Sequence, residues 1–126
     1  MATMQKTVMI IEDEPDAAEL FAEMMRLNGY HVLKTYSGAP AMTLIEQEKP
    51  DLIILDIMMP GVSGLEVLRY LRERPGSSTI PVVVVSARAT PEDIEEGMAA
   101  GASIYLTKPV SYTDLKNAVD GLVRQP

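Results

Sequence analysis

The sequence has no cysteine, so disulfides and thiolate metal sites are excluded and a reducing compartment is compatible. It also lacks a long hydrophobic run, because every apolar stretch is far too short to span a bilayer. No such stretch follows the charge in the opening MATMQK, so we predict no signal peptide. These absences favour a soluble cytoplasmic protein that does not bind a membrane.

Positive charge is scarce too, with 11 Lys and Arg against 18 Asp and Glu and a net charge of −7. Because an acidic domain repels phosphate backbones, we expect no direct binding to nucleic acid. What the sequence does contain is 126 residues, of which 47% are apolar. This is enough to build the core of one compact domain.

Five short apolar runs alternate with segments of helical periodicity. The runs cover residues 8–11, 32–36, 52–55, 80–85 and 104–106. Helices are expected from Pro15 to the Asn28-Gly29 pair, over 40–47, from Ser63 to just before Pro75, from the N-cap Thr90, and after Ser111. Five such βα units predict an α/β domain with five flanking helices.

The runs are apolar at successive positions, which indicates parallel strands buried on both faces. Right-handed crossovers leave few topologies for such a sheet. The first, third and fourth runs are the most apolar and therefore belong at the centre. This predicts the doubly wound, flavodoxin-like strand order 2-1-3-4-5.

Polar residues follow these runs at their carboxyl ends. Glu12 and Asp13 follow the first run, Asp56 the third, Ser86 the fourth and Lys108 the fifth. In a parallel sheet these positions share one edge, and ligands bind there, where the strand order reverses. The first and third strands flank that point, so we expect the three acids to meet.

Three close carboxylates repel one another unless a cation intervenes, and one lysine cannot neutralise them. Hard oxygen ligands suit Mg²⁺, which takes one or two carboxylates, a phosphate and several waters. A carboxylate beside Mg²⁺, faced by a lysine and a hydroxyl, is a phosphoryl-transfer site. Asp56 would be the nucleophile, Lys108 would offset phosphoryl charge, and Ser86 would donate a hydrogen bond.

Simpler interpretations exist for each residue alone. Asp13 or Glu14 could cap the helix that starts at Pro15. Ser86 could be a loop hydroxyl, Lys108 a solvated surface charge, and Tyr105 an amphipathic residue of an edge strand. These interpretations leave the convergence of the strand ends on one site as a coincidence.

At these residues the sequence resembles the response-regulator receiver family of two-component signalling. The matching stretches are VMIIEDEP, DLIILDIMMPGVSGLEVL, IPVVVVSARA and AAGASIYLTKPV. They occur in the right order and spacing, and the resemblance runs from about residue 7 to about residue 123. It implies a receiver domain over residues 5–124, with no effector domain in this chain, and we expect a single-domain regulator.

The resemblance implies a role for each site residue. Asp56 would be phosphorylated, Mg²⁺ (or Mn²⁺) would be held by Asp13, Asp56, the Met58 carbonyl and, through water, Glu12. The amides of Met58 and Ala87, the Ser86 hydroxyl and Lys108 would bind the phosphoryl group. Ser86 and Tyr105 would form the switch, and the Lys108–Pro109 peptide would be cis.

It also implies partners rather than enzymatic turnover. A histidine kinase or phosphotransfer protein would supply the phosphoryl group, as would some small phosphodonors. A downstream protein would bind the face made by the fourth helix, fifth strand and fifth helix, and a phosphorylation-dependent dimer is a further expectation. Ser103 and Ile104 replace two acids common in the family, which puts the salt-bridged dimer of its DNA-binding members in doubt. Met58 and Arg88 predict slow autodephosphorylation.

Other functions fit less well. A haloacid-dehalogenase-type phosphatase needs a second acid two residues after the nucleophile, where Met58 stands. A flavodoxin-like cofactor module needs a phosphate loop rich in Ser, Thr and Gly after the first strand, where EDEP stands. Neither GxxxxGKS/T nor GxGxxG occurs. A receiver that binds partners without being phosphorylated stays open.

Overall fold

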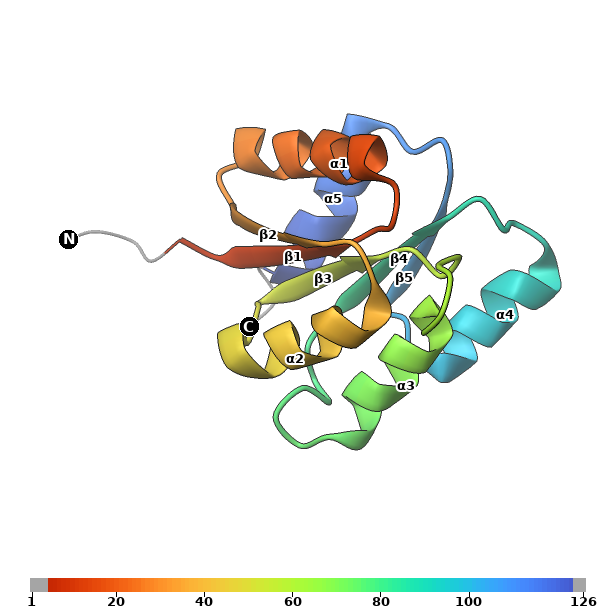
Figure 1. The fold of residues 1–126 in the computed structure, drawn as a ribbon. Helices are drawn as coiled ribbons and strands as arrows, with labels where there is room; N and C mark the ends of the chain where they lie inside the picture. The colour runs from red at the N-terminus through yellow and green to blue at the C-terminus, as the bar shows by residue number, and fades with distance from the viewer. Residues whose placement is uncertain (1–4, 124–126) are drawn as a thin grey trace.

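The computed structural model describes residues 5–123, in which five parallel strands alternate with five helices. The sheet has the order β2-β1-β3-β4-β5 (Figure 1). The strands are β1 (Thr7–Ile11), β2 (His31–Thr35), β3 (Leu52–Leu55), β4 (Val82–Ser86) and β5 (Ile104–Thr107). The helices are α1 (Pro15–Leu27), α2 (Gly38–Glu48), α3 (Gly64–Glu73), α4 (Pro91–Ala100) and α5 (Tyr112–Val123). The predicted fold class and strand order are confirmed. The last residue of the predicted domain, Arg124, lies outside the described residues.

The central strands contribute side chains to two hydrophobic cores, one on each face of the sheet. In Figure 1, α2 and α3 lie on one face of the sheet, and α1 and α5 lie on the other. Met9 and Ile11 belong to the core with residues of α2 and α3, whereas Val8 and Ile10 belong to the core with residues of α1 and α5. All four side chains are fully buried. Each such side chain stabilises the fold by about 1.5–3 kcal/mol, so the apolar runs fix the layers.

The helix termini follow their local signals closely. α1 begins at Pro15, and the chain turns after it at Gly29, whose φ is +90°. Capping boxes start α3 at Ser63 and α4 at Thr90.

Several boundaries differ from prediction by one residue, and two differ by two residues. α2 begins at Gly38, ahead of Pro40, because a proline in the first turn gives up an amide that has no helical partner there. β4 begins at Val82 rather than residue 80, since Pro81 has no amide to donate.

Candidate functional site

The carboxyl ends of the strands bring polar side chains to one edge of the sheet. Backbone pairing continues just past the strands: the Asp56 amide donates to the Ile11 carbonyl at 3.0 Å, and the Lys108 amide donates to the Ser86 carbonyl at 2.9 Å. These bonds place Asp56 beside the end of β1 and Lys108 beside the end of β4. These main-chain hydrogen bonds therefore hold neighbouring strand ends next to each other.

Glu12, Asp13 and Asp56 form a cluster of three carboxylates at this edge. One carboxylate oxygen of each lies within 4.8 Å of the others. Glu12 and Asp56 are 1% and 6% exposed, while Asp13 is partly exposed. The Glu14 amide donates to Glu12 at 3.2 Å. Two acids are thus removed from water, and the third keeps contact with it.

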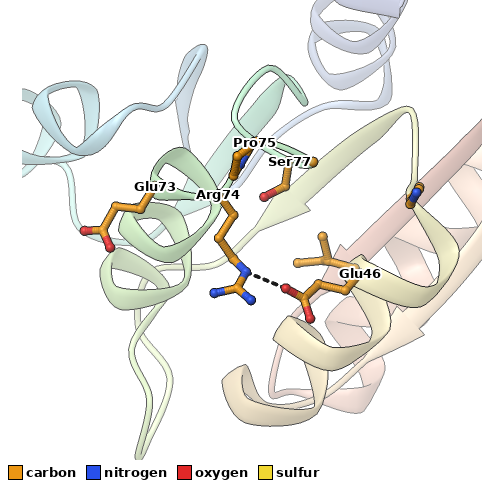
Figure 2. Close-up of a pocket in the computed structure, with 8 residues that line it drawn as sticks. Glu46, Glu73, Arg74, Pro75 and Ser77 are labelled. Atoms are coloured by element: carbon orange, nitrogen blue, oxygen red, sulfur yellow. Dashed lines mark hydrogen bonds and ion pairs between the residues drawn. The ribbon is translucent and has the colours of Figure 1, made fainter.

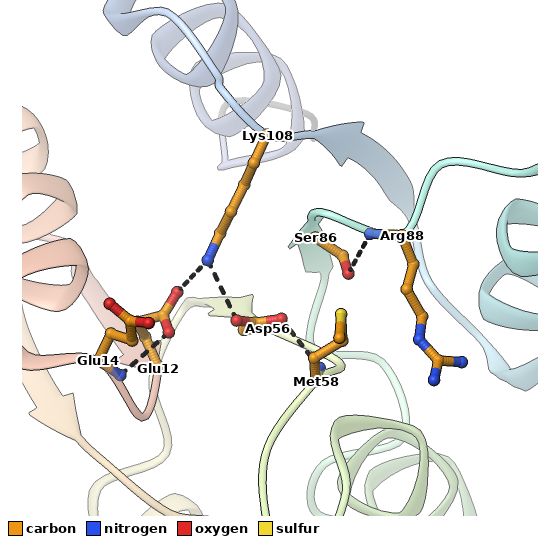
Figure 3. Close-up of polar contacts among 7 residues, drawn as sticks. All are labelled: Glu12, Glu14, Asp56, Met58, Ser86, Arg88 and Lys108. Atoms are coloured by element: carbon orange, nitrogen blue, oxygen red, sulfur yellow. Dashed lines mark hydrogen bonds and ion pairs between the residues drawn. The ribbon is translucent and has the colours of Figure 1, made fainter.

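The Lys108 ammonium binds two of these carboxylates (Figure 3). Its Nζ donates to Glu12 Oε1 at 2.7 Å and to Asp56 Oδ2 at 3.1 Å. Burial raises the pKa of Glu12, even though the bonds from Lys108 and the Glu14 amide oppose the shift. Burial alone would lower the pKa of Lys108, but its two carboxylate partners outweigh burial and raise it. One ammonium cannot offset three carboxylates, so the cluster keeps surplus negative charge.

The donor set fits a hard divalent cation. Carboxylate oxygens gathered at this spacing are ligands that Mg²⁺ takes in proteins, and Mn²⁺ accepts the same oxygen donors. The partial exposure of Asp13 leaves access for the waters that Mg²⁺ retains. The surplus negative charge gives the electrostatic reason for binding a cation.

The loop after β3 presents its backbone to Asp56. The Met58 amide donates to Asp56 Oδ1 at 2.9 Å, while the Met58 side chain is 48% exposed. Gly64 lets α3 start directly against this loop, since a Cβ there would lie 2.4 Å from the Asp56 carbonyl oxygen. Sequence reasoning missed Gly64. The available signal was a glycine immediately after the N-cap Ser63.

The predicted switch residues are connected through the backbone of Arg88. Ser86 is fully buried, and its Oγ accepts the Arg88 amide at 3.2 Å (Figure 3). The Tyr105 hydroxyl donates to the Arg88 carbonyl at 2.7 Å. Burial raises the pKa of Tyr105, and the Ser86 side chain opposes this shift. The sequence gave no signal for this bridge, because both bonds use main-chain groups.

Several simpler interpretations are wrong in this structure. Lys108 is not a solvated surface charge, since it holds two carboxylates. Ser86 ends β4 and is buried, so it is not a loop hydroxyl. Glu14 occupies the N-cap of α1, but its side chain makes no capping hydrogen bond. The Lys108–Pro109 peptide is cis, as predicted. Ala87 directly follows Ser86 and is exposed, and its role stays a prediction.

A hollow of about 510 Å³ lies at the opposite edge of the sheet, between the carboxyl ends of α2 and α3 (Figure 2). There Arg74 pairs with Glu46, which also accepts the Tyr70 hydroxyl at 2.9 Å. These charges neutralise each other far from the acid cluster. A second hollow, of about 400 Å³, is lined in part by Met58 and Arg88, whose amides bond to Asp56 and Ser86 of the candidate site.

Comparison with known proteins agrees with this geometry. The family profile of the response regulator receiver domain matches residues 8–120, so the chain belongs to this family of two-component signalling proteins. Receiver domains are signalling phosphoacceptors that interact with histidine kinases or phosphotransfer proteins and with downstream targets. In the described part of the chain, no helix has the length and apolarity that crossing a membrane requires.

Two relatives and one solved structure illustrate the similarity. The chain is 40% identical over 108 residues to the polar-differentiation response regulator DivK of Brucella ovis, covering 86% of this chain and 88% of DivK. It is 37% identical over 122 residues to the uncharacterized transcriptional regulatory protein YrkP of Bacillus subtilis (strain 168), covering 97% of this chain. It spans about half of YrkP, 51%. The Francisella response regulator 1452 receiver domain superposes with a TM-score of 0.89 at 30% identity, covering 95% of this chain and 98% of that one.

Proposed function

We propose that Asp56 accepts a phosphoryl group in a Mg²⁺-dependent reaction and that the added charge switches a protein-binding surface. The observation that supports this most is the setting of the Asp56 carboxylate. It is buried in an acid cluster, with the Lys108 ammonium on one oxygen and the Met58 amide on the other. Both donors would stabilise negative charge arriving at that carboxylate.

The donor is a phosphohistidine on a histidine kinase or phosphotransfer protein, or a small phosphodonor. A carboxylate oxygen of Asp56 forms a bond to phosphorus while the bond from phosphorus to the imidazole nitrogen breaks, and the electron pair leaves with the imidazole. Lys108, Ser86 and the amides of Met58 and Ala87 donate to the phosphoryl oxygens. Bound Mg²⁺ would supply positive charge against these oxygens. Its ligands would be Asp13, Asp56, the Met58 carbonyl and, through water, Glu12.

The switch starts from the charge and the acceptor oxygens that phosphorylation adds. When the Ser86 hydroxyl donates a hydrogen bond to the phosphoryl group, the bond that Ser86 Oγ accepts from the Arg88 amide changes. That change passes through the Arg88 backbone to Tyr105 and then to the face formed by α4, β5 and α5. A local charge thus biases an element with two arrangements.

This face is where a downstream protein, or a second phosphorylated copy, binds. The chain acts as a phosphoacceptor and carries out no steady turnover of a separate substrate. We assign the receiver to residues 5–124. The salt-bridged dimer of DNA-binding relatives is not expected, since Ser103 and Ile104 lack the acids that it uses.

Treatment with acetyl phosphate and Mg²⁺, followed by intact-mass measurement, tests the proposal. We expect one phosphoryl group on the protein, loss of uptake when Mg²⁺ is chelated, and no uptake by Asp56→Ala. The control Asp16→Ala removes an exposed acid from the first turn of α1 and should leave uptake unchanged. Full labelling of Asp56→Ala would refute the site. No labelling of the wild type would favour a receiver that binds without phosphorylation, and steady hydrolysis of a phosphomonoester would favour a phosphatase.

A further inference from the structure

Helix α4 is held to the domain by few buried groups. Of its ten residues, all within the described part of the chain, Gly97 is the one that is buried. At the carboxyl end, the Arg72 guanidinium donates to the Gly101 carbonyl at 3.0 and 2.8 Å. A helix with so little buried apolar surface depends strongly on each contact that it does make.

The contact at Gly97 is with the ring of Tyr105. A Cβ added at Gly97 would lie 2.8 Å from both Cδ2 and Cε2 of that ring, and 3.6 Å from Cδ1 of Ile57. The ring therefore lies directly against the helix backbone. Glycine destabilises a helix interior relative to alanine, so helix formation does not explain this residue. The position of the Tyr105 ring does explain it.

The hydroxyl group of the same tyrosine is linked by hydrogen bonds to the candidate site. It donates to the Arg88 carbonyl at 2.7 Å, and the Arg88 amide donates to Ser86 Oγ at 3.2 Å. A continuous path therefore runs from the Gly97 backbone through Tyr105 and Arg88 to Ser86. Each step of that path is a contact in this structure.

We propose that Gly97 is a positioning residue: it leaves the space in which the Tyr105 ring lies against the backbone of α4. We call a ring in this position seated, and Gly97 its seat. Its missing Cβ sets the balance between a seated ring, bonded to the Arg88 carbonyl, and an unseated ring. Any side chain at position 97 shifts this balance toward the unseated state without touching the carboxylate cluster. The inference rests on the proposed function where it makes this ring the switch.

Fluorine NMR of protein labelled with 3-fluorotyrosine tests the seat directly. The chain has five tyrosines, and Tyr105→Phe assigns the resonance of interest. We expect Gly97→Ala to move that resonance toward the position of the free amino acid. The control Gly121→Ala adds a methyl to α5, where the new Cβ would meet no atom of residues 5–123 within 4 Å outside its own stretch of helix, and it should leave the Tyr105 resonance in place. An unmoved Tyr105 resonance in Gly97→Ala overturns the proposal.

A double-mutant cycle in urea separates a clash from a general loss of stability. Gly97→Ala should lower the denaturation midpoint when Tyr105 is present. In a Tyr105→Ala background the same substitution should raise the midpoint, because the helix gains alanine and loses no contact, and Gly121→Ala should raise it for the same reason. A midpoint that falls equally in both backgrounds overturns the seat.

Neither measurement uses a phosphodonor, so failure of phosphorylation at Asp56 would leave both results standing. The link to the switch is then tested with acetyl phosphate and Mg²⁺. Gly97→Ala should take up the phosphoryl group, yet its Tyr105 resonance should stay nearer the free position than that of the phosphorylated wild type. A variant that reseats the ring as fully as the wild type overturns the regulatory role of Gly97.

Discussion

At the scale of single residues, Met58 places a thioether two residues after Asp56, beside the proposed phosphorylation site. Its amide contacts Asp56, while its side chain is 48% exposed and cannot donate a hydrogen bond to an attacking water. Met58→Asn should shorten the lifetime of the phosphoryl group by about tenfold, the effect of one good hydrogen bond in a transition state. Decay of the phosphorylated mass measures it. Met98→Asn, at a methionine of similar exposure in α4, is the control. An unchanged lifetime in Met58→Asn would contradict the prediction.

Asp120 is a buried acid remote from the carboxylate cluster. Its carboxylate accepts hydrogen bonds from the Tyr30 hydroxyl at 2.6 Å, the side-chain amide of Asn28 at 2.7 Å and the Lys116 ammonium at 2.9 Å. Burial alone would raise the pKa of Asp120, but these donors outweigh burial and lower it. A carboxyl with a depressed pKa adds stability above its unfolded-state pKa, and the contribution is lost as the pH falls through the folded-state pKa.

The Asp120→Asn variant should therefore lose about 1–3 kcal/mol at pH 7, as expected for hydrogen bonds to a charged group. The loss should begin to shrink below about pH 4, near the unfolded-state pKa, and should disappear as the pH falls through the lower folded-state pKa, where the wild-type carboxyl also becomes neutral. Urea denaturation at several pH values measures both. Asp114→Asn, an exposed acid of the same helix, should show little change. An equal loss for Asp120→Asn at every pH would show that charge is not the cause.

At the scale of elements, Arg72 connects three segments by hydrogen bonds: helix α3, the end of α4 and the loop before β4. Besides the Gly101 carbonyl at the end of α4, it donates to the carbonyls of Ser78 and Ile80 before β4, at 3.1 and 2.7 Å. Burial lowers the pKa of Arg72. The guanidinium thus satisfies carbonyls that the helix end and the loop leave without a strand or helix partner.

Arg72→Met keeps the aliphatic stem but removes these donors. We expect a loss of about 2–4 kcal/mol, since several partly buried carbonyls lose their partners. Faster hydrogen exchange should accompany it at the carboxyl end of α4. Arg69→Met, at an exposed position of the same helix, should cost little. Equal denaturation midpoints for the two variants would show that these bonds contribute no stability.

At the scale of the whole molecule, the surplus negative charge of the cluster predicts that stability depends on a divalent cation. Mg²⁺ at ten times its dissociation constant should stabilise the fold by about 1.4 kcal/mol, because it binds the folded state only. Thermal unfolding at increasing Mg²⁺ concentration measures this. Asp13→Asn should lose most of the dependence, whereas the exposed Asp16→Asn should keep it. A Mg²⁺ effect of equal size in both variants would place the ion elsewhere.

Local patterns were sufficient for the architecture and for the place of the site. The apolar runs of β1, β3 and β4 predict buried central strands, and parallel strands must share a carboxyl edge. The sequence therefore predicted that Asp13 and Asp56 lie close together. Pro15, Ser63 and Thr90 predicted helix starts, because proline geometry and side-chain caps act within one turn.

The sequence by itself determined the layers, the strand order and the meeting of the three carboxylates with Lys108, since periodicity and strand polarity are properties of the chain alone. Only the tertiary structure decided how these groups are connected. The Arg88 bridge uses main-chain atoms, which are alike at every residue and leave no mark in a sequence. The need for glycine at positions 64 and 97 arises from atoms that fold against them, Asp56 and Tyr105, which lie far enough along the chain that no local rule relates them.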